Sequence, residues 1–359
     1  MGDIDADAHV IETMATFDYI EPEFARYKPR VMRQVEGNEV LSNEGGAQKE
    51  FWVIDGRLQP KEGNIGSNTS EESREMRDVS ARLAHMDELN IDVQVLYPTV
   101  FLRAWTQDPI VEYALCKAYN RWLADIWKQA PKRLRWVVMP PVRSMDKVRE
   151  ELVFGKENGA VGVFIRGLEA EMRLAKPYFF KLFEIAQELD LPICFHSGNN
   201  SFSVRDIYAQ ECGFGRSKLP VVSAFHNLIM DGIPQKFPKL RWGFIETGMS
   251  WIPFVLYQLR GTRRADPTFW GPRLFEEYNI WVSYELGEDL PYLLQYVGDD
   301  HVVVGTDYGH HTPGTTDRLA ADPSAQVHMV DNLCSRSDLP AELLDKLLVH
   351  NSARLYTGA

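Results

Sequence analysis

The sequence predicts a (β/α)8 barrel, the TIM-barrel class of α/β fold, on the strength of three observations. The chain has 359 residues, a length that suits eight strands and eight helices with an insertion. Short apolar, β-branched runs alternate with longer amphipathic segments, which is typical of repeated βα units and a parallel sheet. Eight such runs can be counted, and eight strands alternating with eight helices favour a closed barrel over an open sheet. We therefore expect residues 1–359 to form a single barrel domain.

The expected elements are spaced evenly along the chain. Strands are predicted at residues 3–9, 92–97, 134–139, 160–165, 191–196, 240–246, 280–285 and 301–307. Helices are predicted at residues 70–88, 109–128, 145–157, 176–189, 218–230, 252–263, 290–296 and 340–354. Ser70 is a suitable cap for the first of these helices, because acidic residues follow it in the first turn.

One long segment, residues 11–70, interrupts the alternation. It is polar and rich in glycine, and its KEFWVIDGRLQP stretch predicts a hairpin. In a barrel, a segment that follows the first strand lies over the carboxyl ends of the strands, where active sites form. We therefore expect a lid or a cap that selects the substrate. Two further irregular stretches, 198–215 and 308–326, are expected to border the same pocket.

Composition limits the partners and the location of the protein. The chain is 45% hydrophobic and 25% charged, with a net charge of −12, so nucleic acid and anionic membranes are not expected partners. The four cysteines are scattered without a CxxC pair, which argues against a thiolate zinc site and a disulfide framework. The first residues contain no apolar signal region, and no apolar run is long enough to cross a bilayer. We expect a cytoplasmic protein that acts on a small molecule.

Residues that can bind a metal end four of the expected strands. Asp7 and His9 end the first strand, and two residues that are two positions apart on a strand point to the same side. His196 ends the fifth strand, Glu246 the sixth and Asp307 the eighth. Because strand ends converge at one face of a barrel, we expect Asp7, His9, His196 and Asp307 to hold a metal. Imidazole and carboxylate ligands suit Zn, Mn or Fe without choosing among them.

The motifs around these residues resemble the amidohydrolase superfamily, in the branch related to aminocarboxymuconate-semialdehyde decarboxylase known as amidohydrolase family 2. The resemblance covers nearly the whole chain and rests on IDADAHVIE, VGVFIRG, ICFHSG, GIPQKFPKLRWGFIETGMSWIP, VVVGTDYGHHTPG and NSARLY. It implies a distorted barrel with one or two metal ions. It also implies that Asp7 and His9 occupy the usual HxH ligand positions, with Asp in place of the first His. Members of the family commonly dimerise, so a homodimer is expected.

Three further residues are candidates for metal binding or catalysis. Related decarboxylases usually carry a His where this chain has Glu246, which can be a metal ligand, a general base, a partner of a neighbouring His, or only a cap for the next helix. His226 is either a packed helix residue or a ligand beside Glu246. His310, three residues after Asp307, is a candidate for contact with the substrate or the metal.

Two residues are candidates for contact with the substrate. Arg166 ends the fourth strand, where it can meet a carboxylate or phosphate or form an ion pair at the barrel rim. Trp251 can line a bulky apolar pocket or pack in the core.

The candidate residues favour a hydrolase. Glu246, His226 and His310 supply enough donors for a second ion, and a metal site with activated water suits an ester, thioester, lactone or amide substrate. The lid and the aromatic residues suggest a bulky apolar acyl group, such as that of a coenzyme A thioester. The alternative is a non-oxidative decarboxylase of an aromatic or unsaturated acid. A more remote alternative is a binding protein without catalysis, because fold alone does not fix chemistry.

Overall fold

The computed structural model describes residues 2–33, 50–61, 65–66, 68–208, 213–261, 266–310 and 325–358. Its central feature is a sheet of eight strands in the order β1-β5-β6-β7-β10-β11-β12-β13, and the strand pairs within it run parallel. The strands are β1 (Ile4–His9), β5 (Val93–Tyr97), β6 (Leu134–Val138), β7 (Ala160–Arg166), β10 (Ile193–His196), β11 (Trp242–Ile245), β12 (Ile280–Tyr284) and β13 (Val302–Val304). All eight predicted strands are therefore present.

The first and last strands come together and nearly close the sheet into a barrel. Beyond the end of β13, Tyr308 forms a parallel bridge with Ala8 of β1. One residue earlier, the Asp307 backbone N–H donates to the carbonyl of Asp7 over 2.9 Å. The predicted (β/α)8 class is confirmed.

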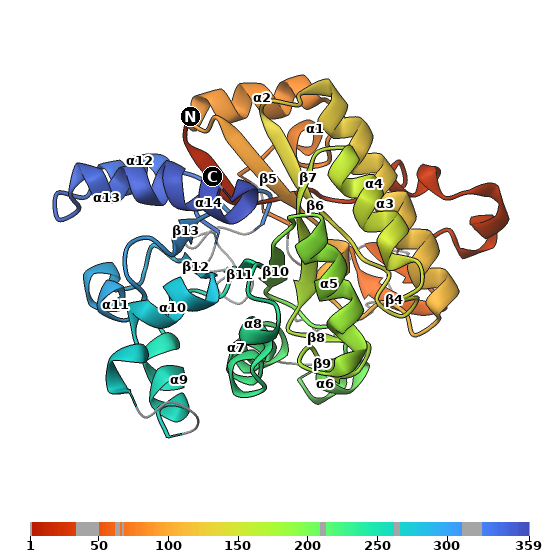
Figure 1. Ribbon diagram of the computed structural model, residues 1–359. Helices are drawn as coiled ribbons and strands as arrows, with labels where there is room; N and C mark the ends of the chain where they lie inside the picture. The colour runs from red at the N-terminus through yellow and green to blue at the C-terminus, as the bar shows by residue number, and fades with distance from the viewer. Residues whose placement is uncertain are drawn as a thin grey trace.

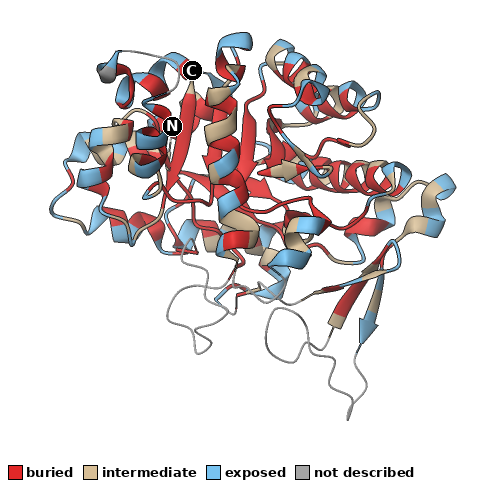
Figure 2. Ribbon diagram, turned by 90° about the horizontal axis from the view of Figure 1, so that it is seen from below, coloured by how far each residue is buried: buried red, intermediate tan, exposed pale blue. Residues whose placement is uncertain are grey.

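Helices surround the strands in the alternating order that the sequence predicts (Figure 1). Figure 2 shows buried strands enclosed by helices that are buried on one side and exposed on the other. The longer helices are α2 (Val79–Glu88), α3 (Pro109–Gln129), α4 (Val148–Glu157), α5 (Phe180–Glu188), α7 (Leu219–Met230), α9 (Ile252–Leu259), α10 (Pro272–Tyr278), α11 (Leu290–Val297) and α14 (Asn351–Thr357). Shorter helices are α1 (Glu71–Arg74), α6 (Phe202–Ile207), α8 (Ile233–Lys236), α12 (Met329–Cys334) and α13 (Ala341–Asp345).

The longest helix, α3, shows why these segments are helical. Asp108 caps it by accepting a hydrogen bond from the Ile110 backbone N–H over 2.7 Å, and Pro109 occupies the first helical position, where its missing N–H costs nothing. Its buried residues recur every three or four positions, so one face packs on the barrel. They include Val111, Leu115, Tyr119, Trp122, Leu123 and Ile126.

The segment predicted as one helix at residues 70–88 forms two helices, α1 and α2, so the prediction of a continuous helix was wrong. Ser70 caps α1 as predicted, by accepting a backbone N–H of the first turn. The chain then leaves the helix at Met76, whose φ of +52° lies in the left-handed region. Asp78 caps α2 as a separate helix. The predicted helix at 340–354 is continuous, because a π-helical turn at Lys346–His350 joins α13 directly to α14.

The hairpin in the segment that follows β1 is confirmed. β3 (Glu50–Ile54) pairs with β4 (Arg57–Pro60) through the turn residues Asp55 and Gly56, whose φ angles are +49° and +70°. Two positive φ angles define the turn that best matches the twist of a two-residue hairpin, and Asp-Gly is a favoured pair for it. β2 (Arg30–Arg33) adds a third antiparallel strand.

The described parts of this segment contact loops at the carboxyl ends of the barrel strands. The Gln59 side chain donates to the carbonyl of Ala104, beyond β5. The Gly66 backbone N–H donates to the carbonyl of Gly309, beyond β13, over 2.8 Å. These contacts place residues 59 and 66 where a lid is expected, and selection of the substrate by this lid stays a prediction. Among the described residues, no helix is both long and apolar enough to cross a membrane.

Candidate metal centre

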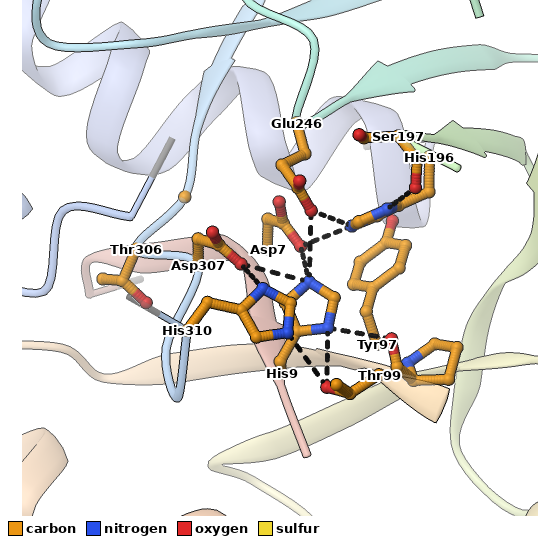
Figure 3. Close-up of polar contacts among 12 residues, drawn as sticks. Asp7, His9, Tyr97, Thr99, His196, Ser197, Glu246, Thr306, Asp307 and His310 are labelled. Atoms are coloured by element: carbon orange, nitrogen blue, oxygen red, sulfur yellow. Dashed lines mark hydrogen bonds and ion pairs between the residues drawn. The ribbon is translucent and has the colours of Figure 1, made fainter. Parts of the chain in front are cut away.

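The first barrel strand directs Asp7 and His9 into the barrel with the help of a β-bulge. Ile4 and Asp5 pair in register with β5, but between Asp5 and Ala8 the strand carries one residue more than its partner. A bulge bends a strand and re-aims the side chains beside it. Asp7 and His9 are both buried, and they point toward the same group of side chains (Figure 3).

Glu246 and Asp307 enter the site from strained backbone positions. They follow β11 and β13, and their φ angles are +55° and +52°. Residues other than glycine rarely adopt the left-handed region, and in enzymes such strain clusters at functional sites. The turn lets each carboxylate point back toward His9 instead of continuing along its strand (Figure 3).

His9 lies at the centre of three carboxylates. Its Nε2 atom is 3.5 Å from Asp7 Oδ1, 3.5 Å from Glu246 Oε2 and 3.3 Å from Asp307 Oδ1. Nδ1 lies 2.9 Å from the carbonyl of Pro98, and a carbonyl can only accept, so Nδ1 carries the hydrogen. Within the part of the chain that the structure describes, Nε2 makes no hydrogen bond of good geometry.

Burial keeps the His9 ring neutral. Its side chain is fully buried, and this desolvation, followed by the nearby His310, lowers the pKa of His9 well below 6.5, although Asp7 opposes the shift. A neutral ring with hydrogen on Nδ1 has its lone pair on Nε2, the atom that faces the carboxylates. Such an arrangement of lone pairs and negative oxygens calls for a cation between them.

His196 repeats this arrangement from β10. Its Nδ1 lies 3.0 Å from the carbonyl of Ser197, so it too carries hydrogen. Its Nε2 lies 3.2 Å from Asp7 Oδ1 and 3.2 Å from Glu246 Oε2. A ligand His in a metal site typically donates its other ring N–H to a carbonyl or carboxylate in this way. The two histidines therefore both present Nε2 to the same carboxylates.

His310 completes the cluster from the loop after β13. It is fully buried, and its Nδ1 lies 2.5 Å from Asp307 Oδ1. Its ring stacks on His9, with centroids 3.9 Å apart and an interplanar angle of 27°. Of the two alternatives that the sequence left open, contact with metal or with substrate, this position allows either.

The potential ligands form two overlapping groups that can each hold an ion. One consists of Asp7, His9, His196 and Glu246, and the other of His9, Glu246, Asp307 and His310; within each, one ligand atom per residue lies within 4.8 Å of the others. All of these residues are buried. Nitrogen and carboxylate oxygen donors fit a divalent transition metal. The donor set and the orientation of His9 Nε2 thus match a metal centre.

His226 and Trp251, two of the other candidate residues, lie outside these groups. His226 lies half-buried on α7 and belongs to neither group of described residues. Trp251 packs against Phe225 with ring centroids 5.0 Å apart, and its Nε1 donates to the carbonyl of Gly248 over 2.8 Å. These contacts are those of a packed residue.

Arg166 forms a buried ion pair with Glu169, which is one of the two roles that the sequence predicted for it. Its Nε and Nη2 atoms donate to the two carboxylate oxygens of Glu169 over 2.7 and 2.8 Å, and both residues are buried. Nη1 donates to the carbonyl of Phe101. The guanidinium therefore ties β7 to the loop after β5, and contact with a substrate stays a prediction.

A buried polar network anchors the backbone carbonyl of His9. The sequence did not predict this network. Arg82 on α2 donates from both terminal nitrogens to the His9 carbonyl over 3.2 Å, and from Nε to Gln94 over 2.6 Å. Gln94 in turn donates to Asp5, which also accepts from the Thr306 backbone N–H. Burial lowers the pKa of Arg82 to about 10 and raises that of Asp5 to about 6. A charged residue inside an otherwise apolar helix pattern, such as Arg82 in ARLAHM, was the available signal.

A barrel with these carboxylates and imidazoles at the carboxyl ends of its strands defines the class of metal-dependent barrel enzymes. A family model described as amidohydrolase matches residues 4–358. The chain therefore belongs to the amidohydrolase family, as its motifs indicate.

Solved structures share this fold. An amidohydrolase from Mycobacterium avium subsp. paratuberculosis is 18% identical, with 99% of each chain covered and a TM-score of 0.76. A 5-carboxyvanillate decarboxylase from Sphingomonas paucimobilis is 16% identical over 99% of this chain and 98% of its own, with a TM-score of 0.67. A 4-oxalomesaconate hydratase from Rhodopseudomonas palustris is 16% identical over 99% and 95%, with a TM-score of 0.63. At such identities the likeness establishes the fold, not the reaction.

Proposed function

We propose that this protein is a metal-dependent hydrolase that uses activated water to cleave an acyl derivative of a bulky apolar acid. The substrate is an ester, a thioester such as an acyl-coenzyme A, a lactone or an amide. The observation that carries the proposal is the position of Asp307. Its Oδ1 atom lies 3.3 Å from His9 Nε2, inside the candidate metal centre, so the carboxylate can meet a water molecule held there.

The metal is Zn, Mn or Fe in this proposal, in one or two ions. Two ions are favoured because Asp307 and His310 belong only to the second ligand group and would hold a second ion together with Glu246, whereas His9 Nε2, with one lone pair, would bind only one of the two. When bound, such a metal lowers the pKa of water toward about 7 and polarises the carbonyl under attack.

Asp307 performs the proton transfers in this scheme. Its carboxylate takes a proton from the attacking water as the water oxygen forms a bond to the acyl carbon. The bond from the acyl carbon to the leaving oxygen, sulfur or nitrogen then breaks, and Asp307 returns the proton to the leaving atom. Glu246 and His310 lie in the same ligand group and are expected to contact the metal or the substrate.

Metal content tests the ligand assignment. His196→Ala is expected to lose at least one ion per chain and most of the activity, because it removes a nitrogen from the first ligand group. His226→Ala is the matched control, since His226 belongs to neither group of described residues, and it should keep the wild-type metal content. Metal per chain is measured on purified protein by elemental analysis. A His196→Ala variant that keeps all its metal would contradict the assignment.

Decarboxylation is the second candidate, because several of the proteins that share the fold are decarboxylases. The two reactions leave different products from substrates incubated in ¹⁸O-labelled water. A hydrolase incorporates one solvent oxygen into the acid that it forms. A decarboxylase releases CO₂ and places a solvent hydrogen on carbon without incorporating oxygen. Release of CO₂ from aromatic acids, with esters and thioesters left intact, would reject the hydrolase.

A further inference from the structure

The three imidazoles of the candidate metal centre are each anchored on the side that faces away from the carboxylates. His9 and His196 both direct Nδ1 to a backbone carbonyl and Nε2 to the carboxylates. His310 is turned the other way, because its Nδ1 faces Asp307 while its Nε2 lies 3.0 Å from the hydroxyl oxygen of Thr99. A side-chain hydroxyl therefore stands where the other two rings have a carbonyl (Figure 3).

The Thr99 hydroxyl oxygen also lies 3.4 Å from His9 Nδ1, and the direction of its hydrogen bond to His310 follows from its third partner, a backbone carbonyl. The hydroxyl lies 2.8 Å from the carbonyl of Val10 and donates its single hydrogen there, since a carbonyl cannot donate. The hydroxyl oxygen is then the acceptor toward His310, so Nε2 of that ring carries hydrogen. When this ring binds an ion it therefore does so through Nδ1, the nitrogen that faces Asp307 Oδ1 over 2.5 Å.

Thr99 is itself held in place by a buried carboxylate. Glu12, which is fully buried, accepts hydrogen bonds from the backbone N–H of Thr99 over 3.1 Å and from that of Val100 over 2.9 Å. The two N–H groups belong to the turn after β5, so the turn is fixed to the segment after β1. The hydroxyl thus has a set position relative to both His9 and His310.

We propose that Thr99 is a positioning residue of the metal centre that determines which nitrogen His310 presents to it. With the Thr99 oxygen as acceptor, hydrogen stays on Nε2, and Nδ1 offers its lone pair to the group formed with His9, Glu246 and Asp307. Without an acceptor at that place, hydrogen moves to Nδ1, where it donates to Asp307 and blocks metal binding by the ring. The inference rests on the metal centre of the proposed function, and it holds whichever reaction that centre performs.

Thr99→Val and Thr99→Ser test this role by cobalt binding. Valine has the shape of threonine without the hydroxyl, and serine keeps the hydroxyl. Metal-free protein is titrated with Co²⁺, and both the affinity and the visible absorption bands are recorded. We expect Thr99→Val to weaken binding by about 10–100-fold and to change the bands, as loss of a partner behind a ligand does, and Thr99→Ser to resemble the wild type.

Thr106→Val is the matched control for loss of a buried hydroxyl. Thr106 is buried and donates to Asp55 in the lid hairpin over 2.7 Å, so its variant should leave cobalt binding unchanged. Cobalt binding by Thr99→Val that equals the wild type would overturn the role of Thr99 and leave the metal centre standing. Failure of the wild type to bind Co²⁺ would remove the metal centre and this inference with it.

The hydrogen position can also be measured in the wild type, with no dependence on how a variant folds. Long-range ¹⁵N–¹H spectra of histidine-labelled protein loaded with Zn²⁺ show which ring nitrogen carries hydrogen and which binds the ion, and His310→Gln assigns the signals. We expect hydrogen on Nε2 of His310. Hydrogen on Nδ1 in the wild type would overturn the proposal, because Thr99 would then not be the acceptor.

Discussion

At the scale of single residues, His9 shows how the fold orients a candidate metal ligand. Its Nδ1 is anchored to Pro98, and its backbone carbonyl accepts from Arg82 on α2. Only Nε2 is left to face the carboxylates. Because the orientation is fixed by segments from β5 and α2, binding an ion need not pay for ordering the ring, which favours affinity and a defined geometry.

His301 gives a pH prediction away from the site. Burial, followed by the nearby Arg354, lowers its pKa from 6.5 to about 4, while Nδ1 donates to the carbonyl of Ile280 over 3.0 Å. The unfolded chain binds a proton first as pH falls, so stability is lost from about pH 6.5 down to about pH 4. Between pH 7.5 and 5 the loss from this residue is about 2 kcal/mol.

His301→Asn isolates this contribution. Asparagine can still donate to Ile280 but does not titrate, so the variant should lose less stability than the wild type between pH 7.5 and 5. Urea unfolding at both pH values measures the difference. His350→Asn, at an exposed position, is the control and should follow the wild type. An equal pH dependence in His301→Asn and the wild type would contradict the assignment.

The sequence predicted which candidate ligands lie together more completely than it predicted the groups that hold them in place. Asp7, His9, His196 and Asp307 lie at or near the carboxyl ends of barrel strands, and in a parallel barrel the strand ends must converge. The sequence could not predict whether His226 reaches the strand ends. Residues on several sides of α7 are buried, so the pattern does not show which side of the helix faces the strand ends. Hydrogen-bond partners such as Thr99 follow from exact distances, which no spacing in a sequence supplies.

At the scale of elements, prediction succeeded where one strong pattern governs a segment. The barrel strands are apolar runs, and the Asp-Gly turn of the lid hairpin leaves few conformations. It failed where a local feature divides a helical pattern, as at Met76 between α1 and α2. It also missed α10 (Pro272–Tyr278) and α12 (Met329–Cys334), since helices this short carry too few turns to show a clear period.

Gly305 gives a prediction about how β13 meets β1. A Cβ atom on Gly305 would lie 2.4 Å from Asp7 Cβ and 2.9 Å from the Asp7 backbone nitrogen. Real side chains do not approach so closely, so Gly305→Ala must push the two strands apart and displace Asp7. We expect lower metal content together with a lower melting temperature.

Gly261→Ala is the control for this substitution, because a Cβ there meets nothing within 4 Å among the described residues. It should change neither metal content nor melting temperature appreciably. Thermal melts followed by circular dichroism and metal analysis of the purified variants compare the two. Gly305→Ala with wild-type metal content would show that the barrel can widen here without moving Asp7.

At the scale of the whole molecule, α14 connects the last described part of the chain to the barrel core. It contacts β1 and β13 at the closure and also β7, the fourth strand of the sheet. A helix that reaches strands so far apart in the sheet order must lie across one end of the barrel. Tyr356 from this helix donates to the carbonyl of Ala6 over 2.6 Å, and its hydroxyl lies 2.8 Å from that of Tyr97.

This position makes α14 a test of whether the barrel unfolds as one unit. Leu355 on α14 is fully buried and faces Gly243 of β11, where an added Cβ would lie 3.2 Å from Leu355 Cδ2. Leu355→Ala should cost about 3 kcal/mol through lost burial and a cavity. If the barrel is cooperative, this loss lowers the urea midpoint for metal release and the midpoint for loss of helical circular dichroism by the same amount. A helix that only frays would instead reduce the dichroism signal at low urea while metal release kept its wild-type midpoint. We expect the two midpoints to shift together, because α14 contacts strands on both sides of the seam that brings Asp7 beside Asp307.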